Sequence, residues 1–399
     1  MRKHRPDFPI LLLALILIAI SLVIIYAIGP RVVLFENTTQ GMGWSENHYI
    51  VRHLPVVVIS LVAMIVAAKY PYAKMEKYGK NMLLAGFGLC LLVAILGKMG
   101  AGIVLCDEGA CRAFSIPILK FGFQPVELIK IGILFYFAWL LKDRKEKGLL
   151  SKQEFWVPTG AIAGATALIV AIFLKDFGST VVIFTMMAAM ILVGGVPLKQ
   201  IALAGGVVLL MLGLLIVIAP HRLKRLASYN GDGDSYHITN SLIGMGTGGL
   251  FGVGLGNSVQ TTGYLPEAVS DSIFSVVCEI WGFLGAMFVI AVYCLLLWRM
   301  LSVSQRTEDK QQALLVIGVF AWIAGHVIIN VGGMTGIIPM KGITLPFLSY
   351  GGTSLVFLSF AVGLVLQISG WTKREKVIDE DSSSRRGQRR TRNAGNRRS

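Results

Sequence analysis

The sequence is poor in charge. Only 15% of its 399 residues are charged, whereas 55% are hydrophobic and the mean hydropathy is +0.69. A soluble chain of this length carries charge on about a quarter of its residues, so a soluble multidomain enzyme is excluded. Intrinsic disorder is excluded for all but the chain ends. The composition predicts a membrane protein that crosses the bilayer several times.

Cysteine is also scarce, and the five cysteines show no spacing typical of metal ligands. Cys90, Cys278 and Cys294 lie in apolar runs, where a thiol acts as a small hydrophobic group. Cys106 and Cys111 flank a short acidic loop, and they can form a disulfide if that loop faces an oxidising compartment. The sequence alone leaves this question open.

Long apolar runs, by contrast, are plentiful. Because a bilayer core requires about 20 apolar residues per helix, the runs predict an all-α polytopic fold with ten transmembrane helices. The first run is longer than the core of a signal peptide, so we expect a retained anchor. The stretch 113–122 could be a re-entrant or interfacial piece. The predicted spans are residues 9–29, 54–69, 82–97, 126–141, 156–174, 178–195, 200–219, 272–298, 312–331 and 345–368.

Basic residues are unevenly divided between the two sides of this topology. With the N-terminus inside, the cytoplasmic segments carry 26 Lys and Arg residues and the outer segments carry ten. A cytoplasmic excess sets the orientation of membrane proteins, so we expect both termini in the cytoplasm. The chain then divides into an N-terminus (1–8), a membrane domain (9–370) with a large outer loop (220–270), and a basic tail (371–399).

The tail holds ten basic and four acidic residues among Ser, Gly and Arg clusters. It cannot bury a core, so we expect disorder. Our preferred interpretation is an orientation anchor that rests on anionic membrane lipids. Docking to a cytoplasmic protein is the alternative. Nucleic-acid binding is disfavoured, because no aromatic residues alternate with the arginines.

The outer loop 220–270 is the longest segment between spans, and loops of this length are usually functional. It begins with PHRLKRL and later has glycine at nearly every second position between Gly244 and Gly256. Repeated glycine suits close approach to a ligand or a tightly turned re-entrant segment. The wording GVGLGN resembles half of a dinucleotide-binding fingerprint, but no strand precedes it. Nucleotide binding is therefore disfavoured.

Two acids follow the glycines, at the outer edge of a predicted span. Glu267 and Asp271 are four residues apart. They either stabilise the helix N-terminus through its macrodipole or serve chemistry at the membrane edge. Glu279 lies two turns deeper, where a carboxylate requires a partner or a water-filled cavity. The residues alone do not decide between these roles.

Other ionisable residues lie near the outer ends of spans. Glu127 and Lys130 are three apart and can neutralise each other. Asp176, preceded by Lys175, lies in a short connection where it can cap a helix. A basic set faces these acids, and such a set suits phosphate or pyrophosphate. Its members are Arg222, Lys224, Arg225 and Lys341.

Two long motifs resemble the signatures of the SEDS family (shape, elongation, division and sporulation). They are GTGGLFGVGLGNSVQTTGYLPEAVSDSIFSVVCEIWGFLGA at 246–286 and IPMKGITLPFLSYGGTSL at 338–355. Further similar blocks lie at 49–67, 123–141 and 175–184, so the resemblance covers all ten spans. The wording is most similar to the cell-division branch of the family, with the elongation and sporulation branches next.

The resemblance implies a ten-span peptidoglycan glycosyltransferase in the bacterial cytoplasmic membrane, at the division septum. Its site would face outside and would join lipid II into glycan strands with inversion at the anomeric carbon. The implied partners are a class B penicillin-binding protein, which cross-links the strands, and other proteins of the division machinery.

The family's catalytic aspartate maps onto Asp271, which would be the general base for the acceptor sugar's 4-hydroxyl. Cationic donors would meet the charge that develops on the pyrophosphate, with a divalent cation (Mg²⁺ or Mn²⁺) as an optional addition. The predicted substrate- or pyrophosphate-binding residues are Lys341, Arg222, Arg225, Glu267 and Ser349. The predicted cavity-lining residues are Glu127, Lys130, Asp176 and Glu279.

The chain departs from the family wording PEAHTDFIF, because Val269, Ser270 and Ser272 replace the His, the Thr and the Phe. Since Asp271 is present, we still expect activity. Three alternatives stay open: an elongation-type polymerase, a lipid II flippase or transporter, and an inactive scaffold for a penicillin-binding protein. A transporter should have paired repeats, and the sequence has no clear internal repeat.

Overall fold

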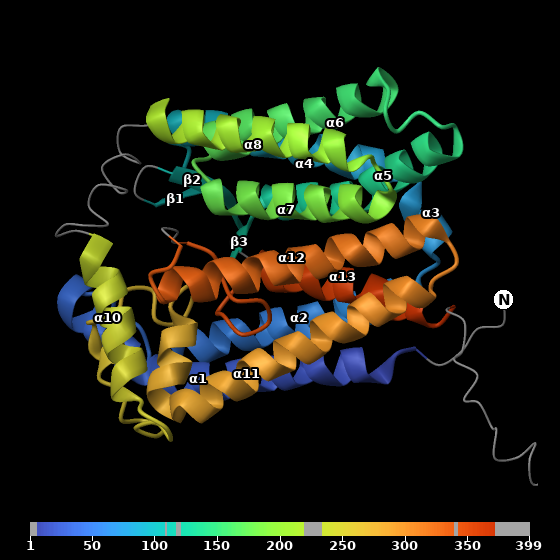
Figure 1. Ribbon diagram of the computed structural model, residues 1–399. Helices are drawn as coiled ribbons and strands as arrows, with labels where there is room; N and C mark the ends of the chain where they lie inside the picture. The colour runs from blue at the N-terminus through green and yellow to red at the C-terminus, as the bar shows by residue number, and fades with distance from the viewer. Residues whose placement is uncertain (1–5, 108–109, 117–120, 219–233, 339–341, 372–399) are drawn as a thin grey trace, which may run out of the picture.

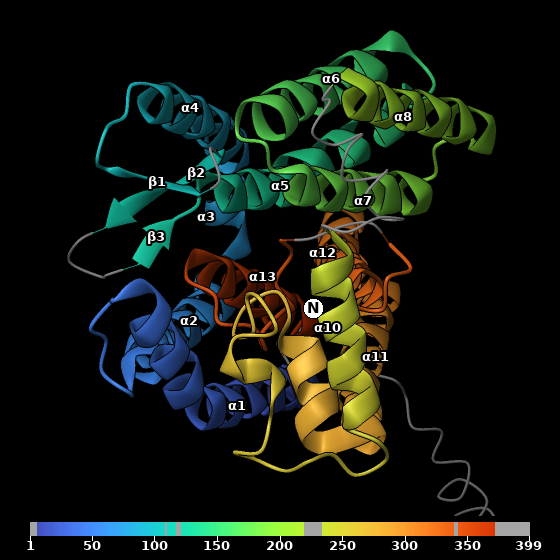
Figure 2. The same cartoon turned by 90° about the vertical axis from the view of Figure 1, so that its left-hand side faces the viewer.

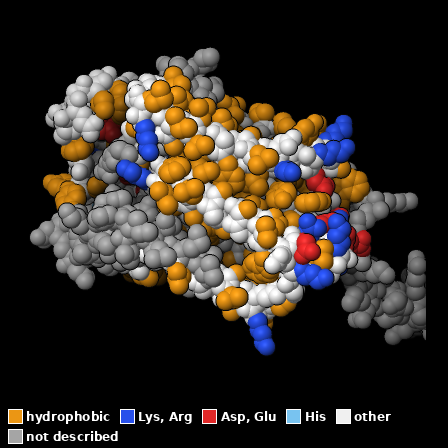
Figure 3. All heavy atoms as spheres, turned by 90° about the horizontal axis from the view of Figure 1, so that it is seen from above, with side chains coloured by type: hydrophobic (Ala, Val, Ile, Leu, Met, Phe, Trp, Pro, Cys, Tyr) orange, Lys and Arg blue, Asp and Glu red, His pale blue; other side chains and the backbone are white. Residues whose placement is uncertain are grey.

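The computed structural model describes residues 6–107, 110–116, 121–218, 234–338 and 342–371. Long helices run side by side along one axis (Figure 1). Seen from above, hydrophobic side chains cover the middle of one face, and many charged side chains gather toward one end (Figure 3). The first six helices are α1 (Phe8–Gln40), α2 (His48–Lys69), α3 (Tyr72–Glu76), α4 (Gly79–Lys98), α5 (Pro125–Glu146) and α6 (Gln153–Ala165).

The second half is also helical. A π-helical stretch, η1 (Thr166–Phe173), continues α6, and a 3-10 turn, η2 (Gln260–Thr262), lies in the glycine-rich loop. Local signals set several ends: Pro125 opens α5, Asp176 and Asp309 cap α7 and α12, and Gly195 ends α7 with a positive φ. The remaining helices are α7 (Phe177–Gly194), α8 (Leu198–Ile218), α10 (Asp234–Thr247), α11 (Ile273–Arg306), α12 (Lys310–Met334) and α13 (Thr353–Ser369).

The all-α polytopic fold is confirmed. Seven helical segments of the described chain are long and apolar enough to cross a membrane: α1, α2, α4, α6 with η1, α7, α11 and α12. The other three predicted spans correspond to α5, α8 and the 17-residue α13. The count of ten membrane crossings therefore stays a prediction.

Three expectations about the non-helical parts require correction. The described parts of the stretch 113–122 are extended strands and not a re-entrant helix, because residues 113–116 and 121–122 belong to an antiparallel sheet of β1 (Val104–Asp107), β2 (Ala110–Ile116) and β3 (Phe121–Phe123). The last span begins at Thr353 rather than at 345, because the residues before it form irregular turns. Part of the predicted outer loop, from Asp234, is the helix α10. The sheet and α10 lie at the same end of the bundle (Figures 1 and 2).

The glycine-rich loop packs against a break in α11. Gly282 has a φ of 68°, which interrupts the helix and frees its local backbone groups. The carbonyls of Glu279 and Ile280 accept hydrogen bonds from Val253 N and Gly254 N at 2.9 and 3.1 Å. The break is thus compensated by loop backbone, which buried polar groups require. The close backbone approach in the structure is to α11 of the same chain, and an approach to a ligand stays a prediction.

Candidate active site

Asp271 lies two residues before α11, at the end of the bundle that carries α10 and the sheet. Its backbone carbonyl accepts a hydrogen bond from Asn330 Nδ2 of α12 at 2.7 Å. The same nitrogen donates to the carbonyl of Ile343 at 2.6 Å. A single buried side chain of α12 therefore joins the two signature motifs and fixes the backbone of Asp271.

The second motif closes on the first through two further contacts. Ser349 Oγ donates to the carbonyl of Ser270 at 2.6 Å, and Tyr350 N donates to that of Val269 at 2.8 Å. Ser349 Oγ also accepts from Leu345 N at 2.7 Å. The buried Ser349 therefore orders the turn beside Asp271, and its predicted contact with substrate stays a prediction.

The carboxylate of Asp271 has an unusual electrostatic environment. Burial raises its pKa from 3.8 to about 7, and the negative charges of Glu267 and Asp176 act in the same direction. The cation Arg112 and the backbone N–H of Gly342 favour the ionised form and limit the rise. An acid with a pKa near neutrality can give up and take up a proton at working pH, which general-base catalysis requires.

Glu267 lies in the same turn and is exposed. Its backbone has a φ of 51°, a region that residues other than glycine rarely adopt. The carbonyl of Glu267 accepts from Ser270 N and Ser272 N, and its carboxylate accepts from Ser270 Oγ at 2.6 Å. Of these contacts, the one from the Ser270 hydroxyl depends on a residue that departs from the family wording.

The connection before α7 brings a second acid and a cation toward Asp271. Asp176 accepts a hydrogen bond from Ser179 N at 3.0 Å, so it caps α7. Lys175 has a φ of 55°, and its carbonyl accepts from Arg112 Nη2 of β2 at 3.0 Å. The capping role of Asp176 and its electrostatic contact with Asp271 are both present.

Glu127 and Lys130 form a buried ion pair on α5. Lys130 Nζ is 2.7 Å from Glu127 Oε1 and 3.5 Å from His326 Nε2 of α12. Nδ1 of the His326 ring lies 3.1 Å from the carbonyl of Thr344. The predicted mutual neutralisation occurs, and the network extends from α5 through α12 to the second signature motif.

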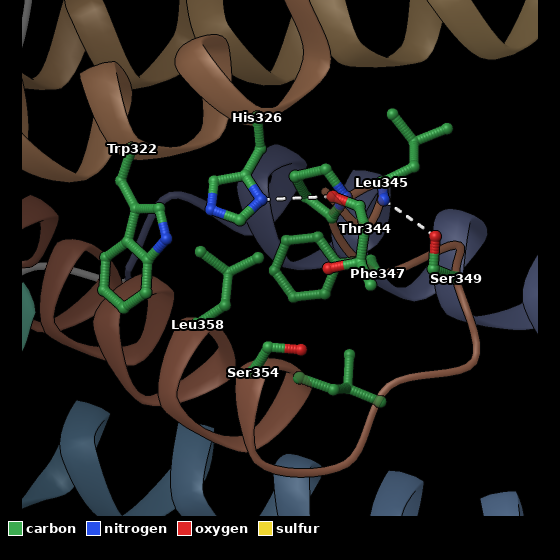
Figure 4. A pocket seen from close by; sticks show the side chains of 10 residues that line it. Trp322, His326, Thr344, Leu345, Phe347, Ser349, Ser354 and Leu358 are labelled. Carbon is green, nitrogen blue, oxygen red and sulfur yellow. Dashed lines mark hydrogen bonds between the residues drawn. The ribbon is translucent and has the colours of Figure 1, made fainter. Parts of the chain in front are cut away.

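A small cavity lies beside this network (Figure 4). It has a volume of about 20 Å³ and is lined by Trp322 and His326 of α12, by Ser349, and by Ser354 and Leu358 of α13. That volume is enough for about one water molecule. Asp271, Glu127 and Lys130 do not line this cavity. Because its volume admits only about one water molecule, the cavity is too small to bind a sugar.

Glu279 contacts the glycine-rich loop and not the turn that holds Asp271. Its buried carboxylate accepts hydrogen bonds from Ser258 Oγ, Val259 N and Gln260 N, at 2.5, 2.8 and 3.2 Å. The partner that a carboxylate at this depth requires is thus the glycine-rich loop. In the structure Glu279 anchors that loop on α11 and is not brought together with Asp271.

The basic set predicted from the sequence lies outside the described residues, since it falls within 219–233 and 339–341. Two residues near Asp271 were missed at the sequence level, Arg112 and Asn330. Arg112 immediately precedes the stretch 113–122, and Asn330 lies one turn after His326 in an otherwise apolar part of α12. A lone amide at membrane depth is a signal for a polar contact, but it does not reveal which one.

Together, the fold and the site define a class: a polytopic helical membrane protein with a half-buried carboxylate of raised pKa at one end of its bundle. The profile of the cell cycle protein family that comprises FtsW, RodA and SpoVE matches residues 8–374. The chain belongs to this family, and the resemblance to the SEDS proteins is confirmed.

Known relatives agree with this assignment. The chain is 34% identical over 384 residues to the probable peptidoglycan glycosyltransferase FtsW of Pseudomonas fluorescens, an alignment that covers 94% of this chain and 90% of that protein. It is 31% identical over 378 residues to the stage V sporulation protein E of Bacillus subtilis, covering 93% and 99%.

Solved structures share the fold. A chain from a peptidoglycan synthase complex that coordinates polymerization and crosslinking superposes with a TM-score of 0.70 at 19% identity, covering 91% of this chain and 97% of that one. The rod shape determining protein RodA of Thermus thermophilus gives a TM-score of 0.66 at 21% identity, covering 93% and 98%.

Proposed function

We propose that this protein is a peptidoglycan glycosyltransferase that polymerises lipid II during cell division. Family membership and the FtsW names of its relatives support this function. They also favour division over elongation. The single observation in the structure that carries the proposal is Asp271, a half-buried acid whose pKa is raised to about 7 where the two signature motifs meet.

In the proposed reaction, ionised Asp271 accepts the proton of the acceptor sugar's 4-hydroxyl. The oxygen attacks the donor's anomeric carbon on the face opposite the leaving group. The bond between that carbon and the pyrophosphate breaks as the new glycosidic bond forms, and the lipid pyrophosphate leaves with the electron pair. Because the attack is from the opposite face, the α-linked donor becomes a β-linked strand.

The leaving pyrophosphate requires cations, because negative charge develops on it in the transition state. We assign this role to Lys341, Arg222 and Arg225 on the basis of their chemistry and their place in the sequence. The described residues contain no group of three His, Cys, Asp or Glu side chains that could hold a metal ion. Phosphate oxygens of the substrate are suitable ligands for a Mg²⁺ or Mn²⁺ ion, and we derive no step through it.

The proposed location is the bacterial cytoplasmic membrane at the division septum, with the site on the outer face. Cys106 and Cys111 are joined as a disulfide in the structure. A disulfide at the end of the bundle that carries Asp271 supports an oxidising, outer compartment for that end. A class B penicillin-binding protein is the proposed partner, because a structural neighbour of the chain comes from a complex that couples polymerization to crosslinking.

In the decisive experiment, lipid II is added to the purified protein, with and without a class B penicillin-binding protein, and the glycan strands formed are measured on a gel. We expect Asp271→Asn to lower the rate by about 10²- to 10⁴-fold, the range for loss of a general base. The matched control is Asp143→Asn, which removes a carboxylate that pairs with Arg144 and Lys147 at the other end of the bundle. The control should polymerise normally.

Three other results would contradict the proposal. Equal product from Asp271→Asn and wild type would remove the base role. Absence of strands with every partner, together with lipid II transfer across vesicles, would favour the flippase. For the orientation, a thiol at Thr262 should react with an impermeant maleimide from outside and a thiol at Lys147 only from inside, in a Cys294→Ser background. The reverse pattern would overturn the topology.

A further inference from the structure

The strand β2 carries Arg112 to Asp271 from a distant part of the chain. Arg112 Nη2 donates to the carbonyl of Lys175 at 3.0 Å, which ties the guanidinium to the connection before α7. The other terminal nitrogen of the guanidinium, Nη1, lies near Gly342. From the point where a Cβ on Gly342 would lie, Asp271 Oδ2 is 3.7 Å away and Arg112 Nη1 is 4.0 Å away. The carboxylate of Asp271, from the first signature motif, and the guanidinium of Arg112, from strand β2, therefore approach the same small space beside Gly342.

A disulfide fixes the strand that holds Arg112. Cys111 is the preceding residue, and it is joined to its β1 neighbour Cys106 across the antiparallel pair. The disulfide also packs on α4: a Cβ on Gly97 would lie 2.5 Å from both Cβ and Sγ of Cys111. Such a distance leaves no room for a side chain, so the glycine permits this contact. The position of Arg112 is thus set by a cross-link and by close packing on a membrane helix.

The charges around Asp271 give this position a consequence. The described charged groups that face the carboxylate are Glu267 in its own turn, Asp176 at the start of α7, and Arg112 from β2. Three further described groups contact this turn: Gly342 donates a backbone N–H to the carboxylate, Asn330 of α12 donates to the backbone carbonyl, and Nε2 of the titratable His237 of α10 lies 3.0 Å from Ser272 Oγ. Among these described neighbours, Arg112 supplies the positive charge that opposes two acids.

We infer that Arg112 is a positioning residue for Asp271, held beside the carboxylate by the disulfide-linked hairpin so that the base is ionised and oriented when the acceptor hydroxyl arrives. This inference rests on the proposed function, because it assigns Arg112 to the same reaction. Arg112 acts through Asp271, and the proposed chemistry does not require it to contact the reacting atoms.

The inference predicts a specific pH signature. An opposite charge within about 4–6 Å lowers a carboxyl pKa by about one to three units. Removing Arg112 therefore raises the pKa of Asp271, and the acidic limb of kcat/KM moves to higher pH. We expect Arg112→Gln to move this limb by about one unit, which is a loss of about tenfold at pH 6 beyond any loss at pH 9. Arg112→Lys keeps the charge and should restore most of the profile.

Two controls separate this role from a general loss of structure. Lys98→Gln removes another cation at the end of α4, where it lies over the ring of Phe173, and should leave the midpoint unchanged. The double variant Cys106→Ser, Cys111→Ser loosens the hairpin and should move the midpoint in the same direction by less. An unchanged midpoint for Arg112→Gln, with a uniform loss of rate, would overturn the inference.

A second readout does not depend on activity. The infrared band of protonated carboxyl groups, followed against pH with Asp271→Asn as the blank, reports the ionisation of Asp271 directly. We expect a higher midpoint in Arg112→Gln than in wild type, and equal midpoints would overturn the inference. If wild type makes no glycan strands but the midpoint still moves, the proposed function fails while the electrostatic role of Arg112 stands.

Discussion

Replacing Asp271 by Asn should stabilise the folded protein at alkaline pH although it lowers the rate of polymerisation. The folded state raises the pKa of this carboxyl from 3.8 to about 7, so the folded chain binds a proton more tightly than the unfolded chain does. Stability from this group is fully present below the unfolded pKa and is lost as the pH rises through 7. At pH 8 the ionised carboxylate therefore opposes folding.

The size of this stabilisation follows from the shift in the pKa of Asp271. About three pKa units at about 1.4 kcal/mol each correspond to about 4 kcal/mol. Asp271 is partly accessible to solvent, and screening lowers the effect that we expect to about 2 kcal/mol. The amide of Asn can still accept from Gly342 N, so the variant removes charge with little change of shape.

The assay is thermal unfolding of the protein in detergent, followed by tryptophan fluorescence at pH 8 and at pH 4. We expect Asp271→Asn to melt above wild type at pH 8 and close to it at pH 4. Asp309→Ala is the control of opposite sign, because Asp309 caps α12 through Gln311 N and Gln312 N and loss of this cap should destabilise the protein. A rise in the melting temperature of Asp271→Asn that is equal at both pH values, or a fall at pH 8, would refute the electrostatic reasoning.

Three further predictions concern the scaffold. Glu279→Gln should destabilise the protein by about 2–3 kcal/mol, because an amide cannot accept all the hydrogen bonds of this buried carboxylate; the yield of folded protein checks this. Gly252→Ala should lower that yield, since its Cβ would lie 2.1 Å from a carbonyl oxygen of α11, whereas Gly246→Ala meets nothing within 4 Å and should be tolerated. Lys130→Met should cost about 3–5 kcal/mol by leaving Glu127 charged and buried, and the double variant Glu127→Gln, Lys130→Met should melt higher than that single variant.

The helices were predictable because each is a local pattern. An apolar run of suitable length gives a membrane helix whatever its neighbours do, and the predicted runs all correspond to helices. The ends were less accurate: α1 continues to Gln40, because a helix does not stop where its apolar composition stops. The strands at 104–107, 110–116 and 121–123 were missed, because three short strands between spans do not show a clear alternating pattern.

The site was predictable only in part. Asp271 follows from the family motif, and its place before an apolar span marks it as a candidate. Its environment depends on contacts between residues far apart in the chain: Arg112 is 159 positions away from it, and Asn330 is 59. No local spacing rule relates such positions. The sequence could therefore name the acid, but it could not identify the groups that set its pKa.

The scaffold also explains why the acid can be kept in an unfavourable state. A carboxylate that opposes folding by about 2 kcal/mol persists only if the surrounding structure fixes its backbone independently. Here Asn330 and the hydrogen bonds from Ser349 and Tyr350 hold the backbone of the turn, and none of them requires the carboxylate. Loss of the Asn330 contact should therefore loosen the turn and reduce activity, and it should also relieve the burial that raises the pKa of Asp271. Asn330→Ala should accordingly move the acidic limb to lower pH, opposite in direction to Arg112→Gln, and the same direction for both variants would contradict this separation of roles.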